Sequence, residues 1–509
     1  MKLLIRAIVT LLLAWTGFAT VATDQLTPVV TTGAGPVQGV MEHGGIHTFK
    51  GIRYGAPPVG DLRFKPPVAP LPWTDVDATT EFGAQAVQSD DPGPSSYGPG
   101  QSEDSLFLNV WTPGLDDRKR PVMFWIHGGA WSYGSGAQPM YHGDNLARQG
   151  DVVVVTVNHR LNVFGYLHLG DILGPEYAES GVAGMLDLVL ALQWVRDNIE
   201  QFGGNSDNVT VFGESGGGLK ISHLLAMPPA EGLFHKAIIQ SGPGLAAVSR
   251  EDGNRLAGNL FERLGIDPRE PEALKTVDAM AVFQAQQGRF APVLNDSSLP
   301  RDPFVPDAPP GAAGIPLMIG TNKDEGTFFM RGDPLFGKWT DADFVRLSEE
   351  ALGDRAPRYI QLMRETFPSY SPTHLVTGIR TSSTWIGSIN LAERKLAQSD
   401  APVYMYMLQW ESPVNNGMMR AAHAIDLPLV FNTVPAGASL VGTGPEPQLL
   451  ADQMSAAWIE FARHGDPNAR DLPYWPAYDT GNRATMLFNT ESRVENDPYD
   501  EIRELLQSR

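Results

Sequence analysis

One serine in this sequence stands where a hydroxyl group is often activated for attack on a carbonyl carbon. The motif Gly-Glu-Ser-Gly-Gly at residues 213–217 directly follows the apolar run 209–212 and precedes a segment with helical spacing. A serine between a strand and a helix in a Gly-x-Ser-x-Gly motif lies on a sharp turn with its hydroxyl exposed, and glycines beside it avoid side-chain clashes. We therefore expect Ser215 to be a nucleophile. A glycine-rich turn without chemistry is the alternative for this motif taken alone.

A second glycine-rich turn, His-Gly-Gly-Ala-Trp at residues 127–131, directly follows the apolar run 122–126. Ester cleavage passes through a tetrahedral oxyanion, which backbone N–H groups aimed at one point stabilise. Small residues let the main chain come close enough, so Gly128, Gly129 and Ala130 are candidate donors. Gly216 offers one more N–H directly after the nucleophile. The two turns together predict an oxyanion hole.

The general base is predicted by elimination, because an acid and then a histidine follow the serine along the chain in this kind of site. The histidines after the serine are His223, His235, His374, His423 and His464. The first two leave no room for the acid, and the last lies at a helix end. His423 follows the apolar run 403–408, as expected for the base, and His374 is its competitor. An unperturbed histidine base predicts a rate that falls as the pH drops through roughly 6 to 7.

The acid must lie between the serine and the histidine, at the carboxyl end of a strand. The run 316–320 has the character of such a strand, and Thr-Asn-Lys-Asp-Glu-Gly follows at residues 321–326. Asp324 and Glu325 are both available there. The spacing does not choose between them.

Short apolar runs recur along the chain and are typical of strands buried on both faces of a parallel sheet. They cover residues 122–126, 152–157, 209–212, 237–239, 316–319 and 403–408. Helical patterns at residues 185–199, 217–226 and 449–463 separate or follow them. This alternation predicts an α/β fold with a mostly parallel sheet and helices on both faces. Residues 29–54 predict an antiparallel start, and residues 341–399 predict a helical cap or side lobe beside the active-site mouth.

The composition is that of an acidic chain without cysteine. The 509 residues have a formal net charge of −20, which disfavours nucleic acid and anionic membranes as partners. Without cysteine there are no disulfides and no thiolate metal sites. The chain shows no repeat, so we expect one large folded unit.

The first residues have the features of an export signal. Lys2 and Arg6 precede the apolar run 7–15, and small residues around Ala22 offer a cleavage site. This predicts a signal peptide at residues 1–22, a mature domain at residues 23–509, and a secreted or periplasmic location. The apolar run is shorter than the ~20 residues of a spanning helix. No other stretch is expected to cross a bilayer, so we expect no membrane span after cleavage.

Five successive motifs make the sequence similar to the type-B carboxylesterases, relatives of the cholinesterases, and above all to the bacterial para-nitrobenzyl esterases. They lie at residues 102–110, 127–131, 213–217, 320–326 and 422–428, and further motifs at residues 51–58 and 475–478 extend the likeness over essentially the whole mature chain. The resemblance implies one α/β-hydrolase domain. It assigns the acid to Glu325 and the oxyanion donors to Gly129, Ala130 and Gly216.

The sequence departs from this family at two positions near the motifs. The family often has cysteine where Ser105 stands, and it usually has alanine where this chain has Gly216. We expect the elbow to stay active with glycine there, but to be looser. With Glu325 as the acid, Asp324 is expected to face solvent or to hold the turn.

The expected reaction is hydrolysis of carboxylic esters through an acyl-enzyme on Ser215, with His423 as base and Glu325 as orienting acid. It calls for no metal or organic cofactor, and its partner is a small-molecule ester. The alternatives are an amidase or carbamate hydrolase with the same triad and a non-catalytic cholinesterase-like binding protein, which would lack triad residues. An apolar pocket suits alkyl or aryl esters. Its candidate walls are Trp131, Phe328, Phe329, Trp385, Met418 and Met419.

Overall fold

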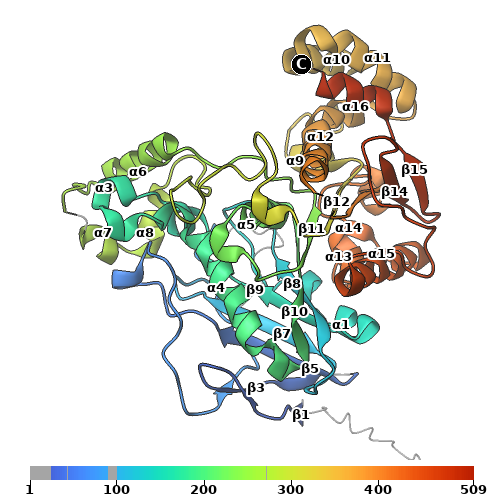
Figure 1. Ribbon diagram of the computed structural model, residues 1–509. Helices are drawn as coiled ribbons and strands as arrows, with labels where there is room; N and C mark the ends of the chain where they lie inside the picture. The colour runs from blue at the N-terminus through green and yellow to red at the C-terminus, as the bar shows by residue number, and fades with distance from the viewer. Residues whose placement is uncertain (1–24, 43, 90–99, 271, 400, 509) are drawn as a thin grey trace, which may run out of the picture.

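One sheet of twelve strands runs through the residues that the computed structural model describes, which are 25–42, 44–89, 100–270, 272–399 and 401–508. The signal peptide expected at residues 1–22 lies outside them. The strand order is β1-β4-β5-β7-β9-β8-β10-β11-β12-β13-β14-β15 (Figure 1). Neighbours from β9 to β14 in this order pair in parallel, and the pairs toward both edges are antiparallel.

The central strands are the ones that the apolar runs predicted. Every residue of β8, β9, β11, β12 and β13 is buried, because helices cover the sheet on both sides. The bounds of the strands in this sheet are β1 Gln25–Leu26, β4 Val40–Glu42, β5 Ile46–Arg53, β7 Phe107–Thr112, β8 Arg120–Ile126, β9 Val153–Val157, β10 Gly204–Glu214, β11 Lys236–Gln240, β12 Leu317–Asn322, β13 Val403–Leu408, β14 Ala484–Phe488 and β15 Arg493–Asn496. A small second sheet contains β2 Val30–Thr31, β3 Pro36–Gln38 and β6 Asp77–Ala78.

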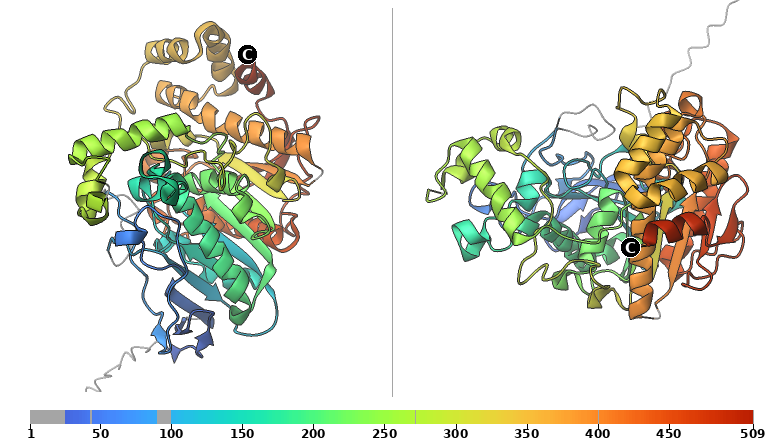
Figure 2. Two further views of the ribbon diagram at one scale, coloured as in Figure 1. Left: turned by 60° about the vertical axis from the view of Figure 1, so that its left-hand side comes forward. Right: turned by 90° about the horizontal axis from the view of Figure 1, so that it is seen from above.

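Helices lie on both faces of the sheet, which confirms the predicted α/β class (Figures 1 and 2). Helices α4 and α5 pack on the face that carries Phe124, and α1 and α15 pack on the face that carries Trp125. The helices are α1 Asp144–Gly150, α2 Asn162–Tyr166, α3 Gly170–Leu173, α4 Ala183–Asn198, α5 Gly216–Leu224, α6 Arg250–Leu264, α7 Glu272–Thr276, α8 Ala279–Ala285, α9 Glu325–Met330, α10 Asp341–Leu352, α11 Ala356–Thr366, α12 Pro372–Gln398, α13 Leu427–Val430, α14 Ala438–Val441, α15 Pro445–His464 and α16 Asp500–Gln507.

The stretch predicted to form a helical lobe contains α10, α11 and α12. In Figure 1, α10 and α11 stand with α16 at the upper right, beyond the end of the sheet that carries β14 and β15. Helix α12 packs against α9 and against the sheet at β12 and β13. The lobe is therefore tied to the strand end from which the predicted acid emerges.

One described segment is long and apolar enough to cross a membrane by length and composition, contrary to the sequence-based expectation. It is Pro175–Phe202, which contains α4, and 78% of its most apolar window is buried inside the molecule. A helix that is apolar on most of its circumference is also what the core of a large protein requires. The expectation missed it because charged residues such as Glu179 and Asp187 interrupt the segment, so that it contains no long unbroken apolar run.

Candidate active site

Ser215 occupies a sharp turn between β10 and α5. Its φ of 54° and ψ of −117° are a conformation that L residues rarely adopt, as in a strained nucleophile elbow. Its neighbours leave no room for side chains, since a Cβ on Gly213 or Gly217 would lie 2.7 Å or 2.0 Å from the carbonyl oxygen of Ile126. The turn places Ser215 on the wall of a cavity at the carboxyl ends of the parallel strands.

The glycine-rich turn after β8 runs directly beside the nucleophile. A Cβ on Gly128 would lie 3.4 Å from the Cβ of Ser215, and Gly129 and Ala130 have φ values of 84° and 52°. A Cβ on Gly216 would lie only 2.4 Å from the backbone nitrogen of Ala130. These distances do not measure the looseness of the elbow, so the expected effect of Gly216 on it stays a prediction. The missing Cβ lets this turn, residues 127–131, lie against the start of α5.

His423 and Glu325 are in direct contact. Nδ1 of His423 lies 2.5 Å from Oε2 of Glu325, and both side chains are buried. Glu325 begins α9 just after β12, and its other carboxylate oxygen accepts the backbone N–H of Asn322 at 2.8 Å. A carboxylate at Nδ1 keeps the ring proton on that nitrogen, so Nε2 becomes the nitrogen available for proton transfer.

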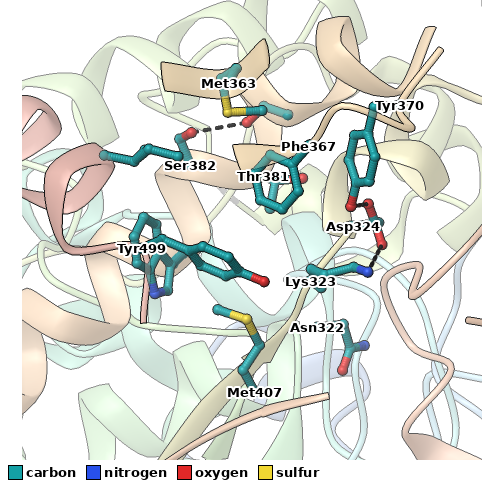
Figure 3. Close-up of a pocket in the computed structure, with 13 residues that line it drawn as sticks. Asn322, Lys323, Asp324, Met363, Phe367, Tyr370, Thr381, Ser382, Met407 and Tyr499 are labelled. Atoms are coloured by element: carbon teal, nitrogen blue, oxygen red, sulfur yellow. Dashed lines mark hydrogen bonds and ion pairs between the residues drawn. The ribbon is translucent and has the colours of Figure 1, made fainter. Parts of the chain in front are cut away.

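Asp324, the alternative acid, points into a different cavity (Figure 3). Its side chain is 3% exposed, and it accepts hydrogen bonds from the hydroxyl of Tyr370 at 2.6 Å and the backbone N–H of Ala421 at 3.2 Å. The prediction that Asp324 faces solvent is therefore wrong, while a role in holding this turn fits its contacts. Burial raises the pKa of its carboxyl group, against the attraction of Lys323.

The competing histidine, His374, is held away from the serine by other partners. Its Nδ1 lies 2.9 Å from the hydroxyl of Ser371, and its Nε2 lies 3.0 Å from the carbonyl oxygen of Met418. Both ring nitrogens are thus occupied in the lobe. The structure brings His423, and not His374, to the cavity that contains Ser215.

The other ring nitrogen of His423 contacts a carboxylate that the sequence analysis did not assign. Nε2 lies 3.0 Å from Oε1 of Glu214, the residue before the nucleophile. Among the described residues, the hydroxyl of Ser215 makes no hydrogen bond to His423. Burial alone would lower the pKa of His423, but Glu214 and Glu325 outweigh it and raise that pKa. Burial also raises the pKa of Glu214 to about 8, against the attraction of His423.

A third buried acid, Asp426, lies behind this group. It accepts hydrogen bonds from the side-chain amides of Gln240 at 2.7 Å and Asn322 at 3.3 Å. Burial raises its pKa, and Glu325 adds to that rise. The signal for Glu214 and Asp426 was present in the sequence, since each is a lone acid within an apolar segment of a motif. Within the described part of the chain, no group of three or more His, Asp or Glu residues could hold a metal ion.

The cavity at Ser215 has a volume of about 910 Å³, its open mouth included. Two of the six predicted wall residues line it. Phe328 and Phe329 line it, with ring centroids 5.5 Å and 4.5 Å from that of His423. Walls that the sequence analysis missed are Tyr133, Gln138, Met140, Tyr141, Arg331, Leu427 and Leu440. They come from loops and from helices of three or four residues, which are too short for apolar periodicity to give a signal.

The other four predicted wall residues lie elsewhere. Trp131 is buried edge-on against Tyr166, because the 127–131 turn directs it into the core. Trp385 lines the cavity of Figure 3 with Asp324. Met418 and Met419 are half-buried outside the Ser215 cavity, and their carbonyl oxygens lie within hydrogen-bond distance of His374 on α12 and Thr327 on α9. The sequence predicted that these residues are apolar and covered, but not which cavity they adjoin.

Comparison with known proteins identifies a family profile and several proteins to which this chain is similar. The profile of the carboxylesterase family matches residues 26–504. The para-nitrobenzyl esterase of Bacillus subtilis is 38% identical over 94% of this chain and 98% of its own length. The phenmedipham hydrolase of Pseudarthrobacter oxydans is 32% identical over 91% of this chain and 95% of its own. A crystal structure of a carboxylesterase from Geobacillus stearothermophilus superposes with a TM-score of 0.83 at 38% identity, covering 94% of this chain and all of that one.

Proposed function

Because this chain belongs to the carboxylesterase family and is a serine carboxylesterase, we propose that Ser215, His423 and Glu325 carry out its reaction. The contact between Glu325 and Nδ1 of His423, in the cavity that Ser215 lines, is the main support for this assignment. Glu325 fixes the tautomer of the ring and stabilises its cation. Phe328 and Phe329 pack against the ring.

The reaction begins when Nε2 of His423 takes the proton of Ser215 and the serine oxygen bonds to the ester carbonyl carbon. The carbonyl oxygen becomes an oxyanion, which the N–H groups of Gly129, Ala130 and Gly216 stabilise, with Gly128 completing the turn. The tetrahedral intermediate then expels the alcohol, which leaves with the proton from His423. Water repeats the sequence on the acyl-enzyme and releases the acid.

Glu214 competes with Ser215 for Nε2 of His423 in this scheme. The ring acts as a base only when Nε2 carries no proton and is directed at the hydroxyl group of Ser215. The 3.0 Å contact with Glu214 therefore belongs to a resting arrangement that precedes the attack. A neutral, protonated Glu214 would allow the ring to turn to Ser215.

An activity-based probe tests the assignment. A fluorophosphonate should label one site on the protein, and peptide mapping should find the label on Ser215. Labelling should vanish in Ser215→Ala and persist in Ser132→Ala, a serine directly after the oxyanion turn. A label that survives in Ser215→Ala would refute the nucleophile. A rate panel of aryl esters, a carbamate and an anilide would separate an esterase from an amidase or carbamate hydrolase.

We further propose that the chain is exported and that the mature enzyme is either secreted or periplasmic. The charged start, the apolar run 7–15 and the small residues before position 23 support export. The absence of cysteine also suits folding in an oxidising compartment.

A further inference from the structure

Lys220 is a buried lysine that the reaction described so far does not use. It lies on α5, one helical turn after Gly216, and its side chain is fully buried. Its ammonium group donates hydrogen bonds to the carbonyl oxygens of Ala130 at 2.8 Å and His127 at 3.1 Å. The same nitrogen lies 5.6 Å from the ring centroid of Trp131. Every one of these contacts is to the oxyanion turn, residues 127–131.

Burying the ammonium group of Lys220 costs free energy, because its protein surroundings replace only part of the water that would solvate it. Burial lowers the pKa of Lys220 to about 7, although the nearby carboxylate of Glu214 opposes that change. The other titratable groups near it are His127 and His159, whose stacked rings are 4.8 Å apart and which Lys220 helps to keep uncharged. Among the described residues Lys220 has no ion pair. Its two strong contacts are carbonyl oxygens.

Those two carbonyls flank the peptide groups that must point at the oxyanion. The N–H groups of Gly128, Gly129 and Ala130 lie between the carbonyl of His127 and the carbonyl of Ala130 along the chain. Gly129 and Ala130 both have positive φ, so this stretch needs outside support to keep one conformation. The carbonyl of His127 also belongs to the peptide group of Gly128, so a cation on that oxygen strengthens the N–H as a donor.

Gly216 and Lys220 act on the same turn from the same side of α5. Residues four apart on a helix share a face. The missing Cβ of Gly216 lets Ala130 come close, and Lys220 then reaches the carbonyl oxygen of Ala130 from the next turn of the helix.

We propose that Lys220 is a positioning residue of the oxyanion hole, which fixes the 127–131 turn on helix α5 by holding the carbonyl oxygens of His127 and Ala130. This inference rests on the proposed function, since it concerns how that function's oxyanion is held. Its effect belongs to the transition state, where the oxyanion has formed, and not to the binding of the ester.

The test is Lys220→Met, which keeps much of the side-chain length and removes the donor. The kcat for a 4-nitrophenyl ester should fall ~10- to 100-fold with KM within about threefold, somewhat less than for loss of a whole oxyanion donor. The affinity for an aryl trifluoromethyl ketone, which forms an oxyanion on the enzyme, should fall by the same factor as kcat/KM. Lys220→Gln, which retains one shorter donor, should lie between the two proteins.

Lys395→Met is the matched control. Lys395 is 1% exposed and also donates to a backbone carbonyl, that of Ala313 at 3.0 Å, but it lies on α12 away from the cavity of Ser215. This variant should lose thermal stability and keep kcat. Equal losses of activity in the two methionine variants, or a ketone affinity unchanged in Lys220→Met, would overturn the inference. So would failure of both Lys220 variants to fold while Lys395→Met folds. Inactivity of the unaltered enzyme on the ester would instead refute the proposed function.

Discussion

Two carboxylates contact the ring of His423, one at each nitrogen, and only one of them can help the reaction. Glu325 at Nδ1 stabilises the cation that forms during attack, whereas Glu214 lies beside Nε2, the nitrogen that must take the proton of Ser215. Both carboxylates raise the pKa of His423. A base with a raised pKa is protonated, and therefore inactive, up to a higher pH. The half-maximal pH of kcat/KM should thus lie above 7 and not in the range of 6 to 7 expected from the sequence.

Glu214→Gln tests that pH dependence. Removing one carboxylate lowers the pKa of His423, so the half-maximal pH should fall by about one unit toward ~6.5. The measurement is kcat/KM for a neutral aryl ester between pH 5 and 10. The same profile on Glu411→Gln, whose carboxylate pairs with Lys323 outside the cavity of Ser215, should not move. An unshifted profile in Glu214→Gln would show that Glu214 does not set the titration.

Glu325 and Asp324 are adjacent, but substituting them should damage different properties. Glu325→Gln removes the charge that orients His423 and should lower kcat by up to ~10⁴ with the fold intact. Asp324→Asn should change kcat by less than about tenfold. It should also cost ~1–3 kcal/mol of unfolding free energy, because the amide group cannot accept both hydrogen bonds of the buried carboxylate. Steady-state kinetics and denaturant melts on both variants decide the matter. If the two variants exchange these phenotypes, Asp324 is the acid.

The sequence predicted the parts of the site that depend on the backbone. Glycines at residues 213–217 and 127–131 encode tight turns locally, and those turns are where the structure has them. The contacts of Lys220, Glu214 and Asp426 depend on side chains packed from distant segments. A sequence shows that such a residue is charged, but not that the fold buries it or which group it meets.

Among the strands and helices, those with a strong apolar pattern were the easiest to predict. β13 has the expected bounds. β10 begins five residues before its apolar core, and the sequence did not predict this part because it is polar and pairs irregularly with β8. The helices of residues 341–399 were foreseen as a lobe beside the active-site mouth, but the packing of α12 against α9, β12 and β13 was not. Amphipathic periodicity shows which face is covered, and leaves open which element covers it.

Helix α9 connects the acid to the mouth of the cavity. Its Phe329 is 44% exposed, lines the cavity of Ser215, and also lines an open groove with residues of α10 and α12. Phe329→Ala should join the two spaces and admit longer acyl chains. The ratio of kcat/KM for 4-nitrophenyl decanoate over butyrate should rise ~3- to 10-fold. Leu335→Ala removes an exposed apolar side chain outside both spaces and should leave the ratio unchanged. An unchanged ratio in Phe329→Ala would mean that long chains follow another route.

For the molecule as a whole, stability depends on burial and on the continuity of one sheet, because the chain has no cysteine with which to cross-link its loops. The active site uses that continuity. Ser215, Glu325 and the oxyanion turn each follow a different parallel strand of the same sheet, so strands from three regions of the sequence must pair before the site exists. Folding must therefore complete the sheet before the enzyme can act.

The first strand of that sheet begins shortly after the predicted signal-peptide cleavage site. Strand β1 pairs with β4 through Gln25 and Leu26, so a cut after Ala22 would leave this edge pairing intact. Enzyme recovered from the envelope or medium of its native host should begin near Thr23, as measured by N-terminal sequencing and intact mass. Ala22→Tyr should block cleavage, since the peptidase requires a small residue there, and should leave uncleaved protein in the membrane fraction. Leu3→Ile, which keeps the apolar character, should be processed normally. Active, soluble protein that retains Met1 would show that residues 1–22 are not removed and that export by this signal is wrong.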